Sequence, residues 1–326
     1  MKNILIADCR LEKDFLTKLE EESNLKWNVA CRLGTMKTPK YLRILNFFIF
    51  PIIILNKNKD CTNILAWQQF YGIFLSVYNK LIYKREININ IMTFIFHSRK
   101  GFIGHLWHKF INYALENNNV KKIIVFSKNE IDYYSSIFPK INYKFIYIPL
   151  GIRHISNLIY DEQLRKQKYI FSTGASNRDY NFLISALKNS QYNVKIACPI
   201  SGQNYNNIEI FQNIYDQRMH YYLYNSYLVV IPLKDLNISS GQLVALQAMQ
   251  MGKPIIITKS KGVTDYLENF KTAIFINNTK TELLEKLSVL YTDNELYNYI
   301  SKNQQETFQL KFSIENLGKN IGRLYK

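Results

Sequence analysis

The sequence predicts an α/β protein made of two doubly wound parallel-sheet domains, and three observations carry this prediction. Short apolar, β-rich runs recur along the whole chain and alternate with stretches of helical periodicity, which is the pattern of strand–helix–strand units. The runs are apolar at consecutive residues, as expected for strands that are buried on both faces of a sheet. The length of 326 residues suits two domains of about 150 residues each.

The first half of the chain has enough strand runs for a complete open sheet. These runs are residues 3–8, 27–31, 63–66, 89–96, 122–127 and 144–149. Helical patterns between them cover residues 68–83, 102–117 and 129–138. The alternation of the two patterns predicts a parallel sheet with helical crossovers.

The second half repeats this organisation. Its strand runs are residues 169–173, 193–198, 208–212, 227–232, 254–258 and 272–276. The helical patterns are residues 179–188, 216–225, 242–251 and 281–303. A second parallel sheet is therefore expected to follow the first.

The joint between the two sheets is expected in the turn at residues 149–151 and in the polar segment 160–168, which lacks periodicity. This gives an N-terminal domain of residues 1–150 and a C-terminal domain of residues 151–310. Residues 311–326 are expected to form a C-terminal helix that packs back on the N-terminal domain. Ligands of open parallel sheets bind beyond the carboxyl ends of the strands, so the chemistry is expected in a cleft that the two domains face.

Composition excludes several classes of protein. Hydrophobic residues make up 47% of the chain and charged residues 21%, which excludes a disordered or fibrous chain. The four cysteines are scattered, so they predict neither a disulfide framework nor a zinc site and fit a reducing compartment. The longest uncharged apolar stretch, residues 44–56, is shorter than the roughly 20 residues of a membrane span. A cytoplasmic location is expected, with the inner face of the plasma membrane as an open alternative.

The net charge of +17 is unevenly spread, with +11 in residues 1–150 and +6 in the rest. A basic half fits nucleic acid, anionic lipid or a phosphate-bearing acceptor, although an AT-rich genome would also enrich lysine. The apolar segment 41–55 predicts peripheral contact with an anionic membrane surface. An ordinary core helix and strand is the alternative. The basic residues near this segment are Lys37, Lys40, Arg43, Lys57 and Lys59.

The region from residue 231 to 258 carries the clearest pattern of a ligand site. A polar loop leads through Ser239 and Ser240 to Gly241, after which a helix is expected from Gln242. Serine caps a helix well, and glycine lets the backbone approach a ligand closely. The amide groups and the positive dipole end of a helix N-terminus bind phosphate. The pattern predicts a diphosphate site. The alternative is an ordinary capped helix between two strands, which would have the same sequence pattern.

A second segment, residues 171–187, supplies a cation at a similar turn. A strand ends at Thr173 and Gly174, Asn177 follows in a small polar loop, and Arg178 stands at the start of an amphipathic helix. The planar guanidinium group of arginine binds phosphate bidentately, although a surface arginine–aspartate pair is the alternative here. Because both segments follow strands in the same half, we expect them to meet at one phosphate site.

Five segments carry a resemblance to a known family. They are SKNEIDYYSSIFP (127–139), IYIPLGI (146–152), TGASNRDYNFLISAL (173–187), SSGQLVALQAMQMGKPIII (239–257) and GVTDYLENFKTAIFI (262–276). In this order they resemble segments of the GT-B glycosyltransferases, closest to the retaining family-4-like enzymes of bacterial polysaccharide and surface-glycan biosynthesis. The resemblance covers residues 120–280 well and the first 120 residues by strand order only.

The resemblance implies two Rossmann-like domains that face each other across a cleft. Residues 1–150 would form the acceptor-side domain, and residues 151–310 would form the domain that binds a nucleotide-sugar donor. Arg178 falls where the family lysine contacts the donor phosphates. Gly241, Gln242 and Leu243 fall at the helix start whose amides hold the pyrophosphate. Gly174, Asn177 and Ser240 are grouped with them as donor-binding candidates.

The sequence departs from the family at both of its paired glutamates. Ser239 stands where the first glutamate touches the donor sugar, and Gln247 stands where the second meets the ribose hydroxyls. An amide still bonds a hydroxyl group. The departure leaves open the identity of the donor sugar and whether the configuration at the anomeric carbon is retained.

Candidate groups for the chemistry of transfer lie after two strands of the first half. Transfer needs stabilisation of the departing diphosphate and a base for the acceptor hydroxyl. Asp8 follows the first strand, and His97 and Arg99 follow the fourth. The alternatives are that Asp8 caps a helix and that His97 merely packs in a loop. No D-x-D triad is present, and we expect no metal and no cofactor besides the donor, a UDP-sugar.

The sequence is therefore interpreted as a hexosyl-type glycosyltransferase. Its predicted partners are a nucleotide-sugar donor and a glycan or polyprenyl-diphosphate-linked acceptor in capsule, exopolysaccharide or lipopolysaccharide assembly, with no nucleic acid. Two alternatives stay open. One is a nucleotide-sugar 2-epimerase of the same fold, and the other is a basic nucleic-acid-binding protein.

Overall fold

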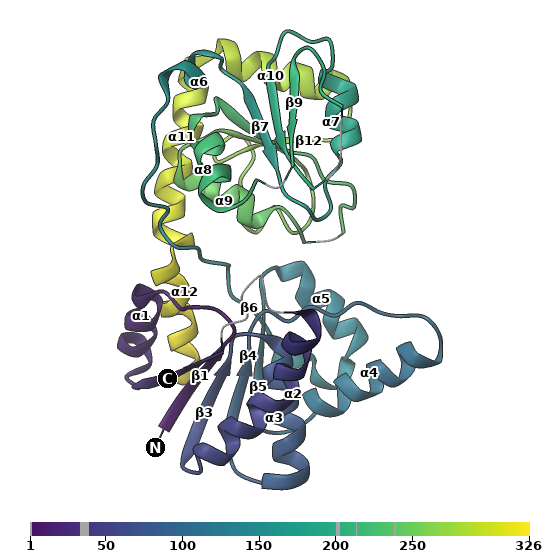
Figure 1. The fold of residues 1–326 in the computed structure, drawn as a ribbon, viewed down its shortest axis with the longest axis vertical. Helices are drawn as coiled ribbons and strands as arrows, with labels where there is room; N and C mark the ends of the chain where they lie inside the picture. The colour runs from purple at the N-terminus through teal and green to yellow at the C-terminus, as the bar shows by residue number, and fades with distance from the viewer. Residues whose placement is uncertain (1, 33–38, 200–202, 213, 238) are drawn as a thin grey trace. The chain divides into compact units, whose positions relative to one another are not determined.

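A computed structural model describes residues 2–32, 39–199, 203–212, 214–237 and 239–326. The chain forms two compact units (Figure 1). The first consists of Met1–Pro149 and Glu315–Lys326, and the second of Leu150–Ile314. The chain thus passes from the first unit to the second after Pro149 and returns after Ile314.

The first unit is built on a six-stranded parallel sheet with the strand order β2-β1-β3-β4-β5-β6. Its strands are β1 (Lys2–Ala7), β2 (Trp27–Cys31), β3 (Cys61–Ala66), β4 (Asn88–Ile91), β5 (Val120–Val125) and β6 (Phe145–Tyr147). Nearly every residue of β1 and the second half of β3 is buried, which explains why these strands are apolar on consecutive positions.

Helices connect the strands of the first unit. They are α1 (Lys13–Ser23), α2 (Lys40–Lys57), α3 (Gln69–Tyr78), α4 (Gly101–Leu115), α5 (Lys128–Ile137) and the C-terminal α12 (Ile314–Gly322). The last helix packs on α1 so closely that a Cβ atom on Gly318 would lie 2.4 Å from the carbonyl oxygen of Phe15. The ring of Tyr325 then meets that of Trp27 at a centroid distance of 4.8 Å.

The second unit has a parallel sheet of the same size, with the order β12-β11-β10-β7-β8-β9. Its strands are β7 (Ile170–Thr173), β8 (Val194–Ala197), β9 (Ile208–Phe211), β10 (Leu228–Ile231), β11 (Ile255–Thr258) and β12 (Ile274–Ile276). Its helices are α6 (Glu162–Lys166), α7 (Tyr180–Leu187), α8 (Asp216–Asn225), α9 (Gln242–Gln250), α10 (Lys280–Thr292) and α11 (Asn294–Thr307).

Each face of this second sheet has its own hydrophobic core. Phe171 belongs to the core that includes α9, while its neighbour Ile170 belongs to the core that includes α7 and α10. The same alternation separates Val229 from Val230. Both faces are covered by helices, so consecutive residues of a strand are all buried.

The predicted fold class is confirmed, since all twelve expected strands are present and both sheets are parallel. Strand β4 is shorter than expected and ends at Ile91 instead of Phe96. The expected helix 281–303 is two helices, because Asp293 ends α10 and its carboxylate caps α11 by accepting from the amide of Leu296. The segment 160–168, expected to lack periodicity, contains the short helix α6.

The sequence pattern missed two helices of the first unit, α1 and α2. Helix α2 runs through Pro51, a residue that usually ends or kinks a helix. This is why the apolar segment 41–55 was open to being part helix and part strand. None of the helices within the described ranges combines the length and the hydropathy needed to cross a membrane.

Candidate functional site

The loop after β7 places a buried cation at the carboxyl end of the second sheet. Arg178 is only 7% exposed. Its Nε donates to the carbonyl oxygen of Thr173 at 3.1 Å, and its Nη1 donates to the carbonyl oxygen of Ser176 at 2.8 Å and to Ser240 Oγ at 3.1 Å. Burial lowers the pKa of Arg178 below its usual value. The guanidinium group is thus held by neutral oxygens alone.

No carboxylate in the described parts of the chain pairs with this arginine. A buried cation without an anionic partner is costly, because desolvation is not offset by a charge of opposite sign. A bound anion such as a phosphate group would supply that partner. The environment of Arg178 therefore points to an anion site.

Gly174 and Asn177 build the loop around the guanidinium group. Gly174 has a φ of +120°, and a Cβ atom there would lie 2.6 Å from Nη2 of Arg178. The Nδ2 of Asn177 donates to the carbonyl oxygen of Asp235 at 2.8 Å, and its Oδ1 accepts from the amide of Asp235, also at 2.8 Å. The Asn177 side chain therefore ties the loop after β7 to the loop after β10.

The loop before α9 joins the same cluster through Ser240. This serine is 8% exposed, accepts from Arg178 and donates to the carbonyl oxygen of Ser176 at 3.2 Å. Gly241 follows with a φ of +94° and begins α9, with no side chain capping the helix. The first amide groups of an α-helix have no partner within the helix. The uncapped start of α9 thus lies beside the arginine.

Ser239 and Gln242 contact each other at the start of α9. The Nε2 of Gln242 donates to Ser239 Oγ. Gly262, in the loop after β11, packs so closely that a Cβ atom on it would lie 2.6 Å from the same hydroxyl oxygen. Leu243 is 53% exposed. Ile238, which is part of the expected loop, lies outside the described residues.

Gln247 lies in the middle of α9 and contacts a residue that the sequence did not indicate. Its Nε2 is 3.1 Å from Nε2 of His220 on α8. Gln247 is 8% exposed, and its Oε1 is buried without a hydrogen-bond partner in the described structure. Nothing in the spacing of His220 singles it out, since the two residues are 27 positions apart.

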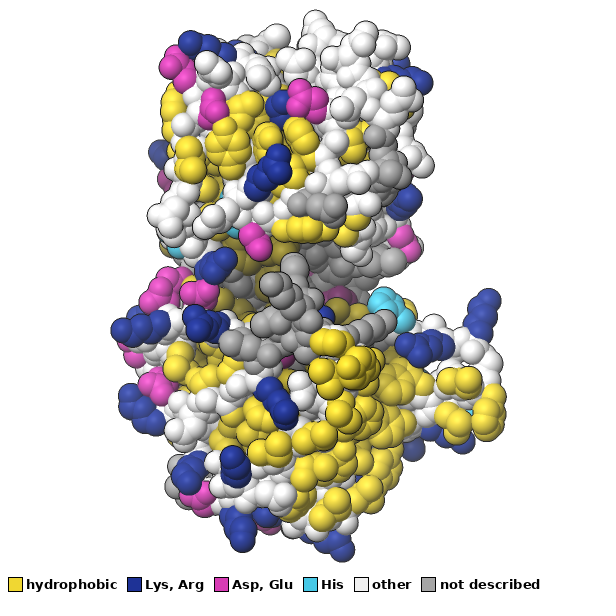
Figure 2. Space-filling view, in the orientation of Figure 1, with side chains coloured by type: hydrophobic (Ala, Val, Ile, Leu, Met, Phe, Trp, Pro, Cys, Tyr) yellow, Lys and Arg dark blue, Asp and Glu magenta, His cyan; other side chains and the backbone are white. Residues whose placement is uncertain are grey.

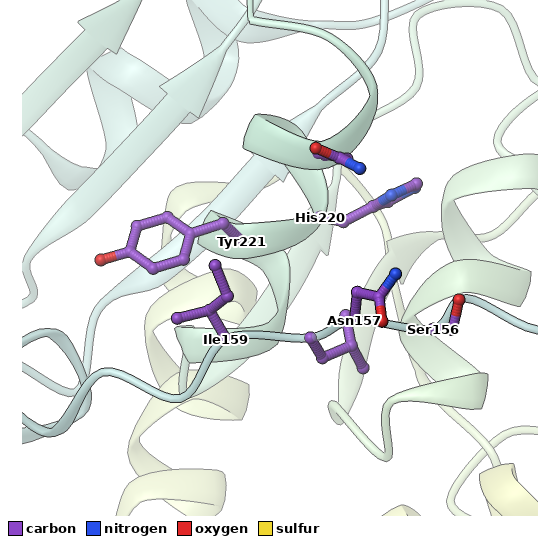
Figure 3. Close-up of a pocket in the computed structure, with 7 residues that line it drawn as sticks. Ser156, Asn157, Ile159, His220 and Tyr221 are labelled. Carbon is purple, nitrogen blue, oxygen red and sulfur yellow. The ribbon is translucent and has the colours of Figure 1, made fainter.

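His220 also lines a cavity of about 290 Å³ in the second unit. The other lining residues come from α8 and from the segment after the first unit (Figure 3): Ser156, Asn157, Leu158, Ile159, Gln217 and Tyr221. Burial lowers the pKa of His220, which favours the neutral imidazole ring.

In the first unit, Asp8 lies in a small pocket at the carboxyl end of β1. The other lining residues are Arg32, Arg43, Asn46, Phe47 and Tyr71. The helix that follows has Glu12 at its N-cap position, so the alternative that Asp8 caps this helix is wrong. The pocket combines a carboxylate with two guanidinium groups.

The other two candidates for the chemistry lie between β4 and α4. His97 and Arg99 are both exposed, so His97 is not a residue that packs into the loop. The guanidinium carbon of Arg99 lies 5.9 Å from the ring centroid of Trp107. Neither residue lines the Asp8 pocket.

The described residues contain no group of three or more His, Cys, Asp or Glu side chains that could hold a metal ion.

Comparison with solved structures identifies the fold. HepE of Anabaena, in complex with UDP, matches with a TM-score of 0.70 at 12% identity, over 98% of each chain. Sucrose-phosphate synthase from Thermosynechococcus elongatus matches with 0.70 at 13% identity, over 100% of this chain and 98% of that chain. The catalytic domain of starch synthase IV from Arabidopsis thaliana, bound to ADP and acarbose, matches with 0.71 at 11% identity over the same shares. The chain has the GT-B fold.

The sequence of the second unit also matches a known family model. Residues 163–307 match the model described as "Glycosyl transferases group 1", and this segment contains every donor-site candidate from Gly174 to Gln247. No curated protein is significantly similar to the chain in sequence. The second unit is thus similar in sequence to group 1 glycosyl transferases, and the resemblance of the chain to GT-B glycosyltransferases is confirmed.

Proposed function

We propose that this protein transfers a sugar from a UDP-sugar to a glycan or polyprenyl-diphosphate-linked acceptor in the assembly of a bacterial surface polysaccharide. One observation carries the donor part of the proposal. Arg178 is buried without a carboxylate partner and is hydrogen-bonded to Ser240, next to the uncapped start of α9. A cationic fork beside a helix N-terminus suits a diphosphate.

The proposed roles combine this arrangement with the roles that the family resemblance implies. Arg178 and the amides of Gly241, Gln242 and Leu243 hold the diphosphate, Ser239 is on the side of the donor sugar, and Gln247 is on the side of the ribose. In the reaction the acceptor oxygen forms a bond to the anomeric carbon, and the bond from that carbon to the diphosphate oxygen breaks. The negative charge that develops on the leaving diphosphate is stabilised by the same cation and amides, so the proposal includes no metal.

The uridine base is proposed from two supporting points. HepE of Anabaena has been solved with UDP and with UDP-glucose, and its chain matches this one over 98% of both. Starch synthase IV was solved with ADP, so adenine is the base to test against. A hexose as the transferred sugar is part of the same proposal.

A lipid-linked acceptor is supported by the apolar surface of α2. This surface consists of Tyr41, Leu42, Ile44, Leu45, Phe48 and Ile49, all at least 38% exposed, and Figure 2 shows apolar side chains gathered on the face of the first unit. Exposed Arg43, Lys57 and Lys59 lie on or next to the helix. Lys37 and the side chain of Lys40 lie outside the described residues. We propose that this surface rests on the anionic inner leaflet of the plasma membrane.

The donor proposal is tested by a thermal-shift screen with UDP, ADP, GDP, dTDP and their sugar derivatives. A ligand at 100 times its dissociation constant stabilises a protein by about 2.7 kcal/mol. We expect UDP and UDP-sugars to raise Tm and UMP to raise it less, because UMP lacks the β-phosphate. Equal shifts with UMP and UDP would contradict a diphosphate site.

The class of reaction is tested by product analysis. Incubation with a UDP-sugar and a polyprenyl-diphosphate-linked acceptor should release UDP and lengthen the acceptor glycan. Conversion of the donor sugar without any acceptor would instead identify a 2-epimerase. Salt-sensitive binding of duplex DNA or RNA, with no response to nucleotide sugars, would identify a nucleic-acid-binding protein.

A further inference from the structure

The side chains of His220 and Gln247 are in hydrogen-bond contact, with 3.1 Å between their Nε2 atoms. With the Gln247 amide oriented in this way, its Nε2 donates and the Nε2 of His220 accepts. An imidazole that accepts at Nε2 is neutral and carries its proton on Nδ1. The lowered pKa of His220, caused by its burial, agrees with this state.

Gln247 itself offers little to a ligand. Its side chain is 8% exposed, and its Oε1 is buried and unpartnered in the described structure. Its Nε2 already donates to His220. A ligand hydroxyl group therefore has no accessible acceptor at position 247, although the family resemblance places a ribose contact there.

His220 has the accessibility that Gln247 lacks. It is half-buried and lines the cavity of about 290 Å³. Figure 3 shows the polar ends of Ser156 and Asn157 on the same side of the cavity as the imidazole ring of His220, while the ring of Tyr221 points away. No lining residue is charged at neutral pH, so the cavity suits neutral hydroxyl groups rather than phosphates.

The distance of Gln247 from the start of α9 fits the distance between the diphosphate and the ribose of a nucleotide. Gln247 lies six residues after Gly241, which corresponds to about 9 Å of helix rise. A nucleotide whose diphosphate lies at the helix start extends over such a distance to its ribose. Helix α9 thus connects the anion site to the His220 cavity.

We propose that His220, held in place by Gln247, binds a ribose hydroxyl group of the nucleotide donor in this chain. Gln247 is a positioning residue that accounts for the neutral tautomer, and the imidazole Nδ1–H donates to the hydroxyl oxygen. This inference rests on the proposed function, since it requires that a nucleotide binds at the start of α9. In the family pattern the residue at position 247 contacts the ribose, whereas the proposal assigns this contact to His220.

The test compares the affinities of UDP, 2′-deoxy-UDP and 3′-deoxy-UDP by calorimetry in the wild type, His220→Ala and Gln247→Ala. A lost hydrogen bond costs about 0.5–1.5 kcal/mol, or roughly 2- to 13-fold in affinity. We expect the wild type to discriminate against one deoxy analogue by this factor. His220→Ala should bind UDP and that analogue equally, and Gln247→Ala should keep part of the discrimination. His220→Asn, which retains a donor, should restore part of it.

The control is Arg218→Ala, an exposed position on the same helix, which should leave the ratio of UDP to deoxy-UDP affinity unchanged. Full discrimination in His220→Ala, or its loss in Gln247→Ala alone, would overturn the assignment of His220 while UDP binding continued to support the proposed function. Failure of the wild type to bind any nucleoside diphosphate would overturn the proposed function and this inference together.

Discussion

At the scale of single residues, the candidate donor site is defined by Arg178, a cation whose burial is unfavourable in free energy. Arg178 has three hydrogen bonds to neutral oxygens and no carboxylate partner in the described structure. Hydrogen bonds to a charged group contribute more to binding than neutral ones, because the charge strengthens them. The cost of burying the cation is therefore recovered when an anion binds.

Replacement of Arg178 separates the contribution of its charge to anion binding from the free-energy cost of burying that charge. We expect Arg178→Gln to weaken UDP binding by about 10- to 100-fold, since hydrogen bonds to charged groups contribute about 1.5–3 kcal/mol. The unliganded variant should be at least as stable as the wild type, because an unpaired buried charge has been removed. Calorimetric titration and thermal unfolding measure the two quantities.

The matched control for this variant is Lys188→Gln, an exposed lysine at the other end of α7. It removes one positive charge from the same helix and should leave UDP affinity unchanged. Unaltered UDP affinity in Arg178→Gln would contradict the assignment of the diphosphate site.

Lys253 leads to a prediction of how the free energy of unfolding depends on pH. Its side chain is buried, its Nζ donates to the carbonyl oxygen of Ser226 at 2.8 Å, and burial lowers its pKa to about 7. Between pH 7 and the ordinary lysine value of 10.5, the unfolded chain binds a proton that the folded protein does not. The free energy of unfolding therefore rises with pH in this window.

Lys253→Met removes this titration. The stability of the wild type relative to the variant should rise from pH 7 to pH 10 and stay constant below pH 6, as measured by urea denaturation at each pH. The exposed Lys261→Met is the control and should run parallel to the wild type. A difference between wild type and Lys253→Met that does not change with pH would show that Lys253 is charged in the folded protein.

At the scale of elements, α2 combines a core helix with an exposed apolar surface. Phe50, Ile54 and Leu55 are buried in the first core, whereas Leu45 and Phe48 are 48% and 42% exposed. Helix α2 therefore has one face in the core of the first unit and one exposed apolar face. The exposed face is where the proposed membrane contact is tested.

The variant Leu45→Glu/Phe48→Glu should lose most binding to vesicles that contain anionic lipid in a flotation assay. Burying a large apolar side chain contributes about 1.5–3 kcal/mol, and the two added charges oppose binding to an anionic surface. We therefore expect at least a tenfold loss, with UDP affinity unchanged.

The control for the membrane test is Leu310→Glu, which alters a residue of the second unit that is 74% exposed. This variant should bind the vesicles like the wild type. Equal binding of all three proteins, or no binding by the wild type, would rule out α2 as a membrane-contacting surface.

At the scale of the whole molecule, the chain ends in the unit where it began. Residues Glu315–Lys326 belong to the first unit, and α12 packs on α1 at Gly318. The first unit therefore depends on a segment that is separated from the rest of it by the entire second unit.

Gly318→Leu should destabilise the protein by about 1–3 kcal/mol, which is typical of overpacking, because a side chain at this position meets the backbone of Phe15 at 2.4 Å. Thermal unfolding followed by tryptophan fluorescence, to which Trp27 beside Tyr325 contributes, measures the effect. The exposed neighbour variant Lys319→Leu should unfold like the wild type. Equal stability of both variants would show that α12 does not stabilise the first unit.

The sequence by itself determined the twelve strands, the parallel class of both sheets and the residues at the start of α9. These are local properties, because an apolar run or a Ser-Ser-Gly turn before a helix is read from consecutive residues. The match of residues 163–307 to the glycosyltransferase family has the same local origin. Helices α1 and α2 were missed. Helix α2 contains Pro51, a residue that usually ends or kinks a helix, whereas α1 has a clear amphipathic pattern that the prediction did not use.

Only the tertiary structure decided which side chains meet. The bond between Arg178 and Ser240 joins residues 62 positions apart, and the contact between Gln247 and His220 joins residues 27 positions apart. Neither distance follows from a periodic pattern, because strand order and the packing of α8 on α9 bring these residues together. The sequence identified Arg178 and Gln247 as candidates. Only the folded chain shows that Arg178 is buried without a charged partner and that Gln247 is buried against His220.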